Sequence, residues 1–124
     1  MPTNLVSLRQ SAFASQSGRC YYCSFPMWED DIKLFAQAHN ITLGQAQWYK
    51  CTAEHLEARS EGGLDVKNNI VAACYFCNLK RHQRKKAPAP DAYRQLVRQR
   101  LSNGRWHLPS SIRICMVREM NITI

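Results

Sequence analysis

The chain has 124 residues, which suits one domain with a core small enough to gain from a bound metal. Its 17 lysines and arginines outnumber 9 acidic residues and give a formal charge of +8, which favours nucleic acid, ahead of an anionic membrane surface, as the partner. The sequence has neither a run of about 20 apolar residues nor a secretory stretch at its start, so it excludes a membrane-spanning protein and indicates a cytoplasmic one.

Two helices are predicted in the N-terminal part. The first occupies residues 1–19, with Thr3 as N-cap and Gly18 as its end, and its apolar side chains recur at helical spacing. The second begins at the acidic residues 29–31, which suit the positive end of a helix dipole, and ends at Asn40. Both patterns are amphipathic, so each helix is expected to bury one side.

Two strands and a helix follow. The segment WYKCTAEHL, residues 48–56, is rich in aromatic and β-favouring residues, and NIVAAC, residues 69–74, is a short apolar run. The glycines at 62 and 63 place a loop between them, and the pattern becomes helical from 75 to 85. The predicted frame is therefore strand, loop, strand, helix.

The last part of the chain is predicted to hold a helix and a strand. Residues 87–90, APAP, form a stiff spacer, and residues 91–104 form a helix capped by Asp91 and closed by an Asn-Gly pair. Apolar residues alternate along 110–124, which indicates a strand-like tail that pairs either within the chain or with a second copy in a homodimer. The expected fold class is α+β, in a single domain over 1–124.

Two Cys-x-x-Cys pairs predict a zinc site. Cys20 and Cys23 form one pair, Cys74 and Cys77 the other, and each holds two thiolates about one turn apart, a spacing typical of ligands around tetrahedral Zn²⁺. Four thiolates leave no open position for a substrate, so this zinc is expected to be structural and to contribute to folding. The other two cysteines lack partners at ligand spacing and are expected to lie in the core.

A carboxylate and a histidine stand side by side on the first predicted strand, as Glu54 and His55. Asn69 opens the second strand, and Asn78 directly follows the second cysteine pair. With EH, then RSEGG, then NNIVAACYFCN, residues 20–86 resemble the HNH (ββα-metal) endonucleases, as an H-N-N variant with a four-cysteine zinc site. The resemblance implies a small zinc-stapled ββα-metal core flanked by helices.

The resemblance also implies roles for these residues. His55 would act as general base, and Asn69 would orient the strand or the ring of that histidine. Glu54 and Asn78 would bind one catalytic Mg²⁺ or Mn²⁺, ions that prefer hard oxygen ligands. Asn68 would take the place of Asn69 if the strand register differed by one residue.

Basic residues near this motif are expected to contact phosphate groups, which position a nucleic acid without reading its sequence. One lies in the glycine-bearing loop, and the others follow along the predicted helix and its end. They are Arg59, Lys80, Arg81, His82, Arg84, Lys85 and Lys86. For His82, four residues after Asn78 and on the same helical face, a contact with the catalytic metal is the alternative.

The sequence therefore predicts a metal-dependent endonuclease that hydrolyses phosphodiester bonds of DNA, most readily double-stranded DNA. By family resemblance, cleavage would leave a 5′-phosphate and a 3′-hydroxyl. The alternative is a zinc-stapled nucleic-acid-binding module without catalysis. Such a module would use the same basic helix and would need neither Glu54 nor His55.

Overall fold

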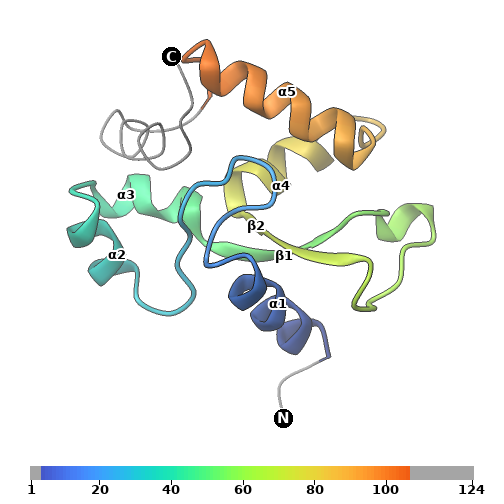
Figure 1. Cartoon of the computed structure of the whole chain (residues 1–124), viewed down its shortest axis with the longest axis horizontal. Coiled ribbons are helices and arrows are strands. Elements are labelled where there is room, and N and C mark those ends of the chain that lie inside the picture. The colour runs from blue at the N-terminus through green and yellow to red at the C-terminus, as the bar shows by residue number, and fades with distance from the viewer. Residues whose placement is uncertain (1–3, 107–124) are drawn as a thin grey trace.

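A two-stranded antiparallel sheet lies at the centre of the fold in the computed structural model, which describes residues 4–106 (Figure 1). Strand β1, Cys51–His55, pairs with β2, Ile70–Cys74, so that the first residue of one faces the last of the other. The first strand is shorter than predicted, because the aromatic residues before it form the 3-10 helix η1, Gln47–Tyr49. The predicted pair of strands is otherwise confirmed.

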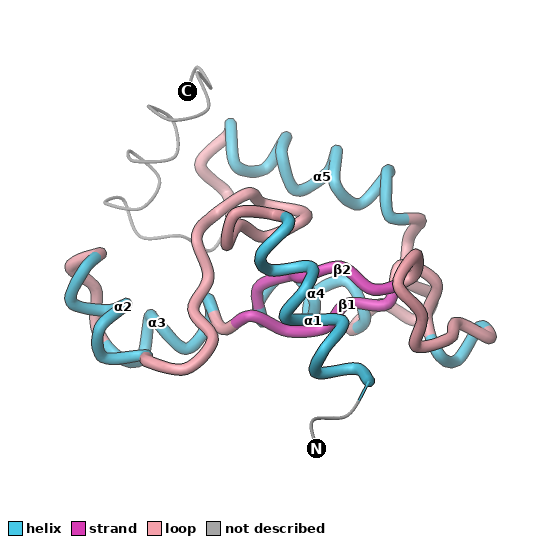
Figure 2. Tube along the Cα trace, turned by 60° about the horizontal axis from the view of Figure 1, so that its bottom comes forward, coloured by secondary structure: helices cyan, strands magenta, loops and turns pink. Residues whose placement is uncertain are grey.

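Helices cover both faces of this sheet (Figures 1 and 2). α1, Asn4–Ser15, packs on one face, while α4, Tyr75–His82, lies on the other with α5, Pro90–Ser102, beyond it. Gln16 fastens the end of α1 to the outer edge of β2. Its side-chain amide donates to the carbonyl of Ala72 at 2.8 Å and accepts from the N–H of the same residue at 2.9 Å. The order β1, β2, α4 gives the expected α+β fold with a ββα core.

Two short helices occupy the end of the sheet where β1 begins (Figure 1). α2, Ile32–Ala38, starts after Asp31, whose carboxylate caps it by accepting a backbone N–H at 3.0 Å, and this confirms the helix predicted after the acidic residues. α3, Leu43–Ala46, was not predicted. Its start is fixed by a capping box built on Thr42, which stabilises a helix too short to show a clear hydrophobic period.

Several predicted helix boundaries differ in the structure. α1 ends at Ser15 rather than at Gly18, and its predicted N-cap, Thr3, lies outside the described residues. α4 ends at His82 rather than at 85, so the basic residues at 84–86 follow the helix. α5 begins at Pro90 with Ala89 as N-cap, because proline suits the first position of a helix. Asp91 therefore lies within the first turn and does not cap the helix, which corrects that prediction.

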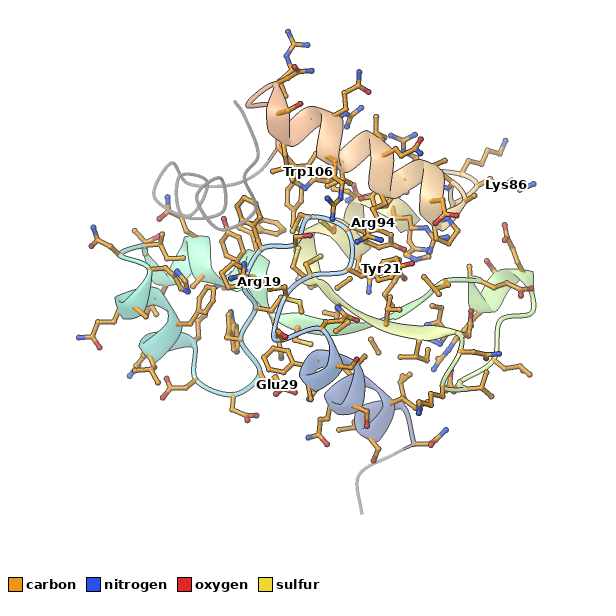
Figure 3. All side chains as sticks on the ribbon, in the orientation of Figure 1. Arg19, Tyr21, Glu29, Lys86, Arg94 and Trp106 are labelled. Atoms are coloured by element: carbon orange, nitrogen blue, oxygen red, sulfur yellow. The ribbon has the colours of Figure 1, made fainter. Side chains whose placement is uncertain are left out.

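Aromatic side chains and cysteines fill much of the core. Tyr22, Tyr49 and Tyr93 are buried, and the rings of Tyr22 and Tyr93 meet edge to face with centroids 4.8 Å apart. Trp106 is directed from the end of α5 toward the same interior (Figure 3). The four paired cysteines belong to this cluster, so the predicted metal site and the hydrophobic core are one structure.

Residues 1–3 and 107–124 lie outside the described part of the chain, and with them the strand predicted at 110–124 and a homodimer contact through it. None of the described helices is both long and apolar enough to cross a membrane. The longest of them, α5, has 13 residues.

Candidate metal centres and active site

The four cysteines of the two Cys-x-x-Cys pairs meet in one buried cluster. Cys20 and Cys23 lie in the turns that follow α1, whereas Cys74 ends β2 and Cys77 lies in the first turn of α4. Their sulfur atoms all lie within 4.8 Å of one another, and those of Cys23 and Cys74 are 3.9 Å apart. Tetrahedral Zn²⁺ with bonds of about 2.3 Å holds sulfurs about 3.8 Å apart, so the cluster fits this ion.

Hydrogen-bond donors aimed at the sulfurs favour thiolates in this cluster. The N–H of Cys74 donates to Cys20 Sγ at 3.3 Å, that of Cys77 donates to Cys74 Sγ at 3.4 Å, and the indole of Trp106 donates to Cys77 Sγ at 3.4 Å. Burial, together with hydrogen bonds from the other three cysteines, raises the pKa of the Cys77 thiol well above its ordinary value. A dication would supply the charge that lets all four thiols ionise, so binding it would release protons.

An open hollow of ≈ 280 Å³ lies where β1 leaves the sheet, beside the C-terminal half of α4. Its lining combines the acid–histidine pair of β1 with side chains from the following loop and from α4. These residues are Glu54, His55, Ala58, Arg59, Ser60, Asn78 and His82. Neighbouring residues of a strand point to opposite faces, yet both members of the pair border this one hollow.

Glu54 is held in a fixed position in this hollow, with 1% of its surface exposed. Its Oε2 accepts hydrogen bonds from the hydroxyl of Tyr22 at 2.8 Å and from the guanidinium of Arg81 at 3.0 Å. Burial and the charge of Glu54 raise the pKa of Tyr22, so the phenol stays protonated as a donor. The other carboxylate oxygen, Oε1, lies 2.8 Å from Nε2 of His82. Oε2 is thus anchored inside the protein by Tyr22 and Arg81, whereas Oε1 is directed toward His82.

Arg81 is an internal residue, which corrects the prediction that it contacts phosphate. Only 2% of its surface is exposed. Besides binding Glu54, its guanidinium donates to the carbonyls of His55 and Leu56, both at 2.8 Å, and of Pro88, at 3.0 Å. Arg81 therefore neutralises the buried carboxylate and ties the end of β1 to the chain that follows α4.

Asn78 and His82 both line the hollow, because they lie four residues apart and so extend from the same side of α4. The amide nitrogen of Asn78 donates to Oγ1 of Thr52 at 3.0 Å, which leaves its amide oxygen as the atom able to bind a cation. With the carboxylate of Glu54 and the imidazole of His82, it forms a donor set that fits a divalent ion such as Mg²⁺ or Mn²⁺. His82 therefore lies beside the free oxygen of Glu54, at the hollow that Asn78 also lines.

His55 is paired with an acid that the sequence analysis did not identify. Its Nε2 lies 2.7 Å from Oδ1 of Asp65 and 3.2 Å from Nε of Arg59. Nη2 of Arg59 donates to both carboxylate oxygens of Asp65, at 3.0 and 3.3 Å. The hydrogen bond with His55, reinforced by the charge of Arg59, lowers the pKa of Asp65. The shorter contact, to a carboxylate, is the stronger one. That contact is a hydrogen bond when Nε2 carries the proton, and in this tautomer the electron pair of the ring lies on Nδ1.

Asn69 lies outside the hollow and acts on the loop between the strands. Its amide oxygen accepts from the N–H of Glu57 at 2.8 Å, and its amide nitrogen donates to the carbonyls of Glu57 at 3.1 Å and Leu64 at 2.9 Å. Its backbone carbonyl accepts from Leu56 at 2.9 Å. Asn69 thus contacts the continuation of the histidine-bearing strand rather than the imidazole, and it braces the loop of residues 56–69.

The remaining basic residues predicted to contact phosphate are exposed. Lys80, Arg84, Lys85 and Lys86 lie on the outer side of α4 and just after it. Figure 3 shows Lys86 extending away from the connection between α4 and α5. Arg59 has 60% of its side-chain surface exposed at the hollow itself. Positive charge therefore lies around the same end of α4 that carries His82.

Comparison with known proteins gives a match over this region. A family model described as HNH endonuclease matches residues 20–84, just over half of the chain. The matched segment contains both cysteine pairs and every residue that lines the hollow. No curated protein and no solved structure matches the chain.

Proposed function

The chain belongs to the HNH endonuclease family, and from this premise we propose that it is a metal-dependent endonuclease that hydrolyses DNA phosphodiester bonds. The observation that supports the proposal most directly is the shared hollow. A histidine paired with a carboxylate, a three-residue donor set for a divalent ion and an exposed arginine all border it. Hydrolysis of a phosphodiester needs this combination of a base, a cation and a phosphate contact.

His55 is the general base of the proposed reaction. Asp65 accepts the proton-bearing Nε2, so the ring presents Nδ1 to a water molecule. Nδ1 takes one proton from the water, the resulting hydroxide attacks phosphorus, and the bond between phosphorus and the 3′-oxygen breaks. The products are a 5′-phosphate and, once the leaving oxygen is protonated, a 3′-hydroxyl.

Glu54, Asn78 and His82 would hold the catalytic divalent ion. When bound, such an ion stabilises negative charge on the phosphate and on the departing oxygen. The chain prepares for it by burying one oxygen of Glu54 against Tyr22 and Arg81, which fixes the direction of the other. Arg59, exposed at the edge of the hollow, is placed to contact the phosphate.

Zinc has a different role in this proposal. The four cysteines connect the chain before the sheet to β2 and α4, and no atom of the catalytic set belongs to their cluster. The bound zinc would therefore hold α4 in place. Asn78 and His82 belong to α4, so their positions depend on it. DNA would be positioned by the exposed residues Lys80, Arg84, Lys85 and Lys86.

Plasmid cleavage tests the proposal. Purified zinc-loaded protein should convert supercoiled plasmid to nicked or linear forms with Mg²⁺ or Mn²⁺, and His55→Ala should abolish this while keeping its zinc content and its affinity for DNA. Zinc content is the matched control, because the cysteine cluster does not include the histidine. Salt-dependent DNA binding without cleavage under any of these metals would instead identify a zinc-stapled binding module.

A further inference from the structure

An aromatic hollow of ≈ 340 Å³ lies at the opposite end of β1 from His55, beside α3 and the start of α4. Trp48 and Tyr75 have 41% and 43% of their surfaces exposed there, more than any other aromatic side chain of the described residues. The hollow is lined by Trp28, Ile32, Gln47, Trp48, Lys50 and Tyr75. Its lining is mainly apolar, which distinguishes it from the polar hollow that holds the acid–histidine pair.

One side of α4 joins the two hollows. Tyr75, Asn78 and His82 follow one another at spacings of three and four residues, so their side chains form a single stripe. A shallow depression lined by these three residues together with Thr52 and Leu79 connects the catalytic hollow to Tyr75. The helical rise places Tyr75 about 10 Å along the axis from His82, which is about the length of three stacked nucleotides.

The aromatic rings of this hollow contact their neighbours and still stay partly exposed: Trp48 meets Phe76 edge to face with centroids 5.7 Å apart, and 41% of its surface is exposed. Trp48 and Tyr75 meet at 41° with centroids 5.7 Å apart, and the indole N–H of Trp28 is fixed by the carbonyl of Ala46 at 2.7 Å. Lys50 places its ammonium 5.7 Å from the centroid of Trp28. Apolar ring faces beside a cation are complementary to a nucleobase that is attached to a phosphate.

We propose that this hollow binds an unpaired nucleobase of the substrate strand, stacked on Trp48 and Tyr75, with Lys50 near the adjoining phosphate. The inference rests on the proposed function, because it requires a nucleic acid strand to run from the catalytic hollow along α4. A base within a duplex already stacks on its neighbours and does not present a free face. The hollow therefore selects substrates with a gap, a flap or a single-stranded segment next to the cut.

Binding measurements on the full-length, zinc-loaded protein test this inference, with Ca²⁺ replacing Mg²⁺ to prevent cleavage. The probes are a duplex and the same duplex with a gap that contains 2-aminopurine, whose fluorescence falls on stacking. Trp48→Ala should weaken binding to the gapped probe roughly 10-fold or more and leave binding to the intact duplex unchanged. Trp48→Phe, which keeps a ring, should retain the preference, as should the control Leu34→Ala, which truncates an exposed apolar residue outside the hollow.

Four results would overturn the inference. Trp48→Ala could bind the gapped probe as well as the wild type does, or it could lose affinity for both probes equally. If the wild type still cleaved plasmid, either result would refute the inference and leave the proposed function intact. A change in the solution mass of Trp48→Ala would assign the hollow to a contact between copies of the chain. A wild-type protein that neither binds nor cuts nucleic acid would remove both the proposed function and the inference.

Discussion

Replacing Arg81 with alanine is expected to destabilise the protein strongly. The guanidinium is the cationic partner of Glu54 in a pair whose side chains expose only 3% and 1% of their surfaces. It also donates to three backbone carbonyls, those of His55, Leu56 and Pro88. Alanine would leave a carboxylate and three carbonyls without this donor, in positions that water reaches poorly.

Removing one member of a buried ion pair costs about 3–5 kcal/mol, because the remaining charge stays buried without its partner. Small domains have free energies of unfolding of about 5–15 kcal/mol, so Arg81→Ala should remove a large part of the total. Lysine should not rescue the variant, because a single ammonium group cannot reach acceptors that the planar guanidinium spans. Adding Glu54→Gln to Arg81→Ala should recover about 1–3 kcal/mol, since the unpaired charge is then absent.

Urea unfolding followed by circular dichroism, with zinc in excess throughout, measures these free energies. Arg84→Ala is the matched control: it removes an arginine three residues away that is exposed, so stability should change by no more than about 0.5 kcal/mol. If Arg81→Ala unfolded at the same urea concentration as Arg84→Ala, the guanidinium would not be a buried internal partner. Failure of Glu54→Gln to recover stability would show that lost packing, and not an unpaired charge, explains the effect.

Three other changes test the site and its loop. Asp65→Ala should lower kcat roughly 10- to 100-fold with little change in KM, because a positioned base accelerates a reaction about 10²–10⁴-fold and the ring of His55 would lose the carboxylate that orients it. A kcat equal to that of the wild type would exclude this orienting role. Gly63→Ala should lower the unfolding temperature, since the added Cβ would collide with the backbone carbonyl of Glu57, and an unchanged melting curve would contradict this loop conformation. Replacing Lys85 and Lys86 with alanine should reduce the slope of log affinity against log salt by about 1 for each lysine, as measured by fluorescence anisotropy; an unchanged slope would place the DNA elsewhere.

Elements with strong local signals were predicted well from the sequence. The helix after Asp31 carries a carboxylate where the first N–H groups need an acceptor, and the two short strands flank a loop rich in glycine. α3 was missed because its four residues are held by a capping box rather than by a periodic apolar face. Trp48 was assigned to a strand on its intrinsic preference, but the chain turns there to place the aromatic residues of η1 against α4.

The parts of the candidate site that could be predicted are those made by residues close together in the sequence. Two Cys-x-x-Cys pairs fix pairs of sulfurs locally. Neighbours on a strand point to opposite faces, so the spacing of Glu54 and His55 alone did not determine that both border one hollow. The roles of Tyr22 and Asp65, and the internal role of Arg81, were missed because their partners lie 32, 10 and 27 residues away along the chain, and no local pattern encodes such contacts. An acidic residue after the paired glycines was the one available signal for Asp65, and an acid in a loop most often faces solvent.

α4 carries one residue of the sulfur cluster within a few positions of two residues of the candidate active site, which limits where the chain length can change during evolution. Cys77 belongs to the sulfur cluster, while Asn78 and His82 face the catalytic hollow. Inserting one residue between them would rotate the later side chains by about 100°, turning them away from Glu54 while the cysteines stayed in place. Homologous sequences should therefore keep the number of residues between Cys74 and His82 constant.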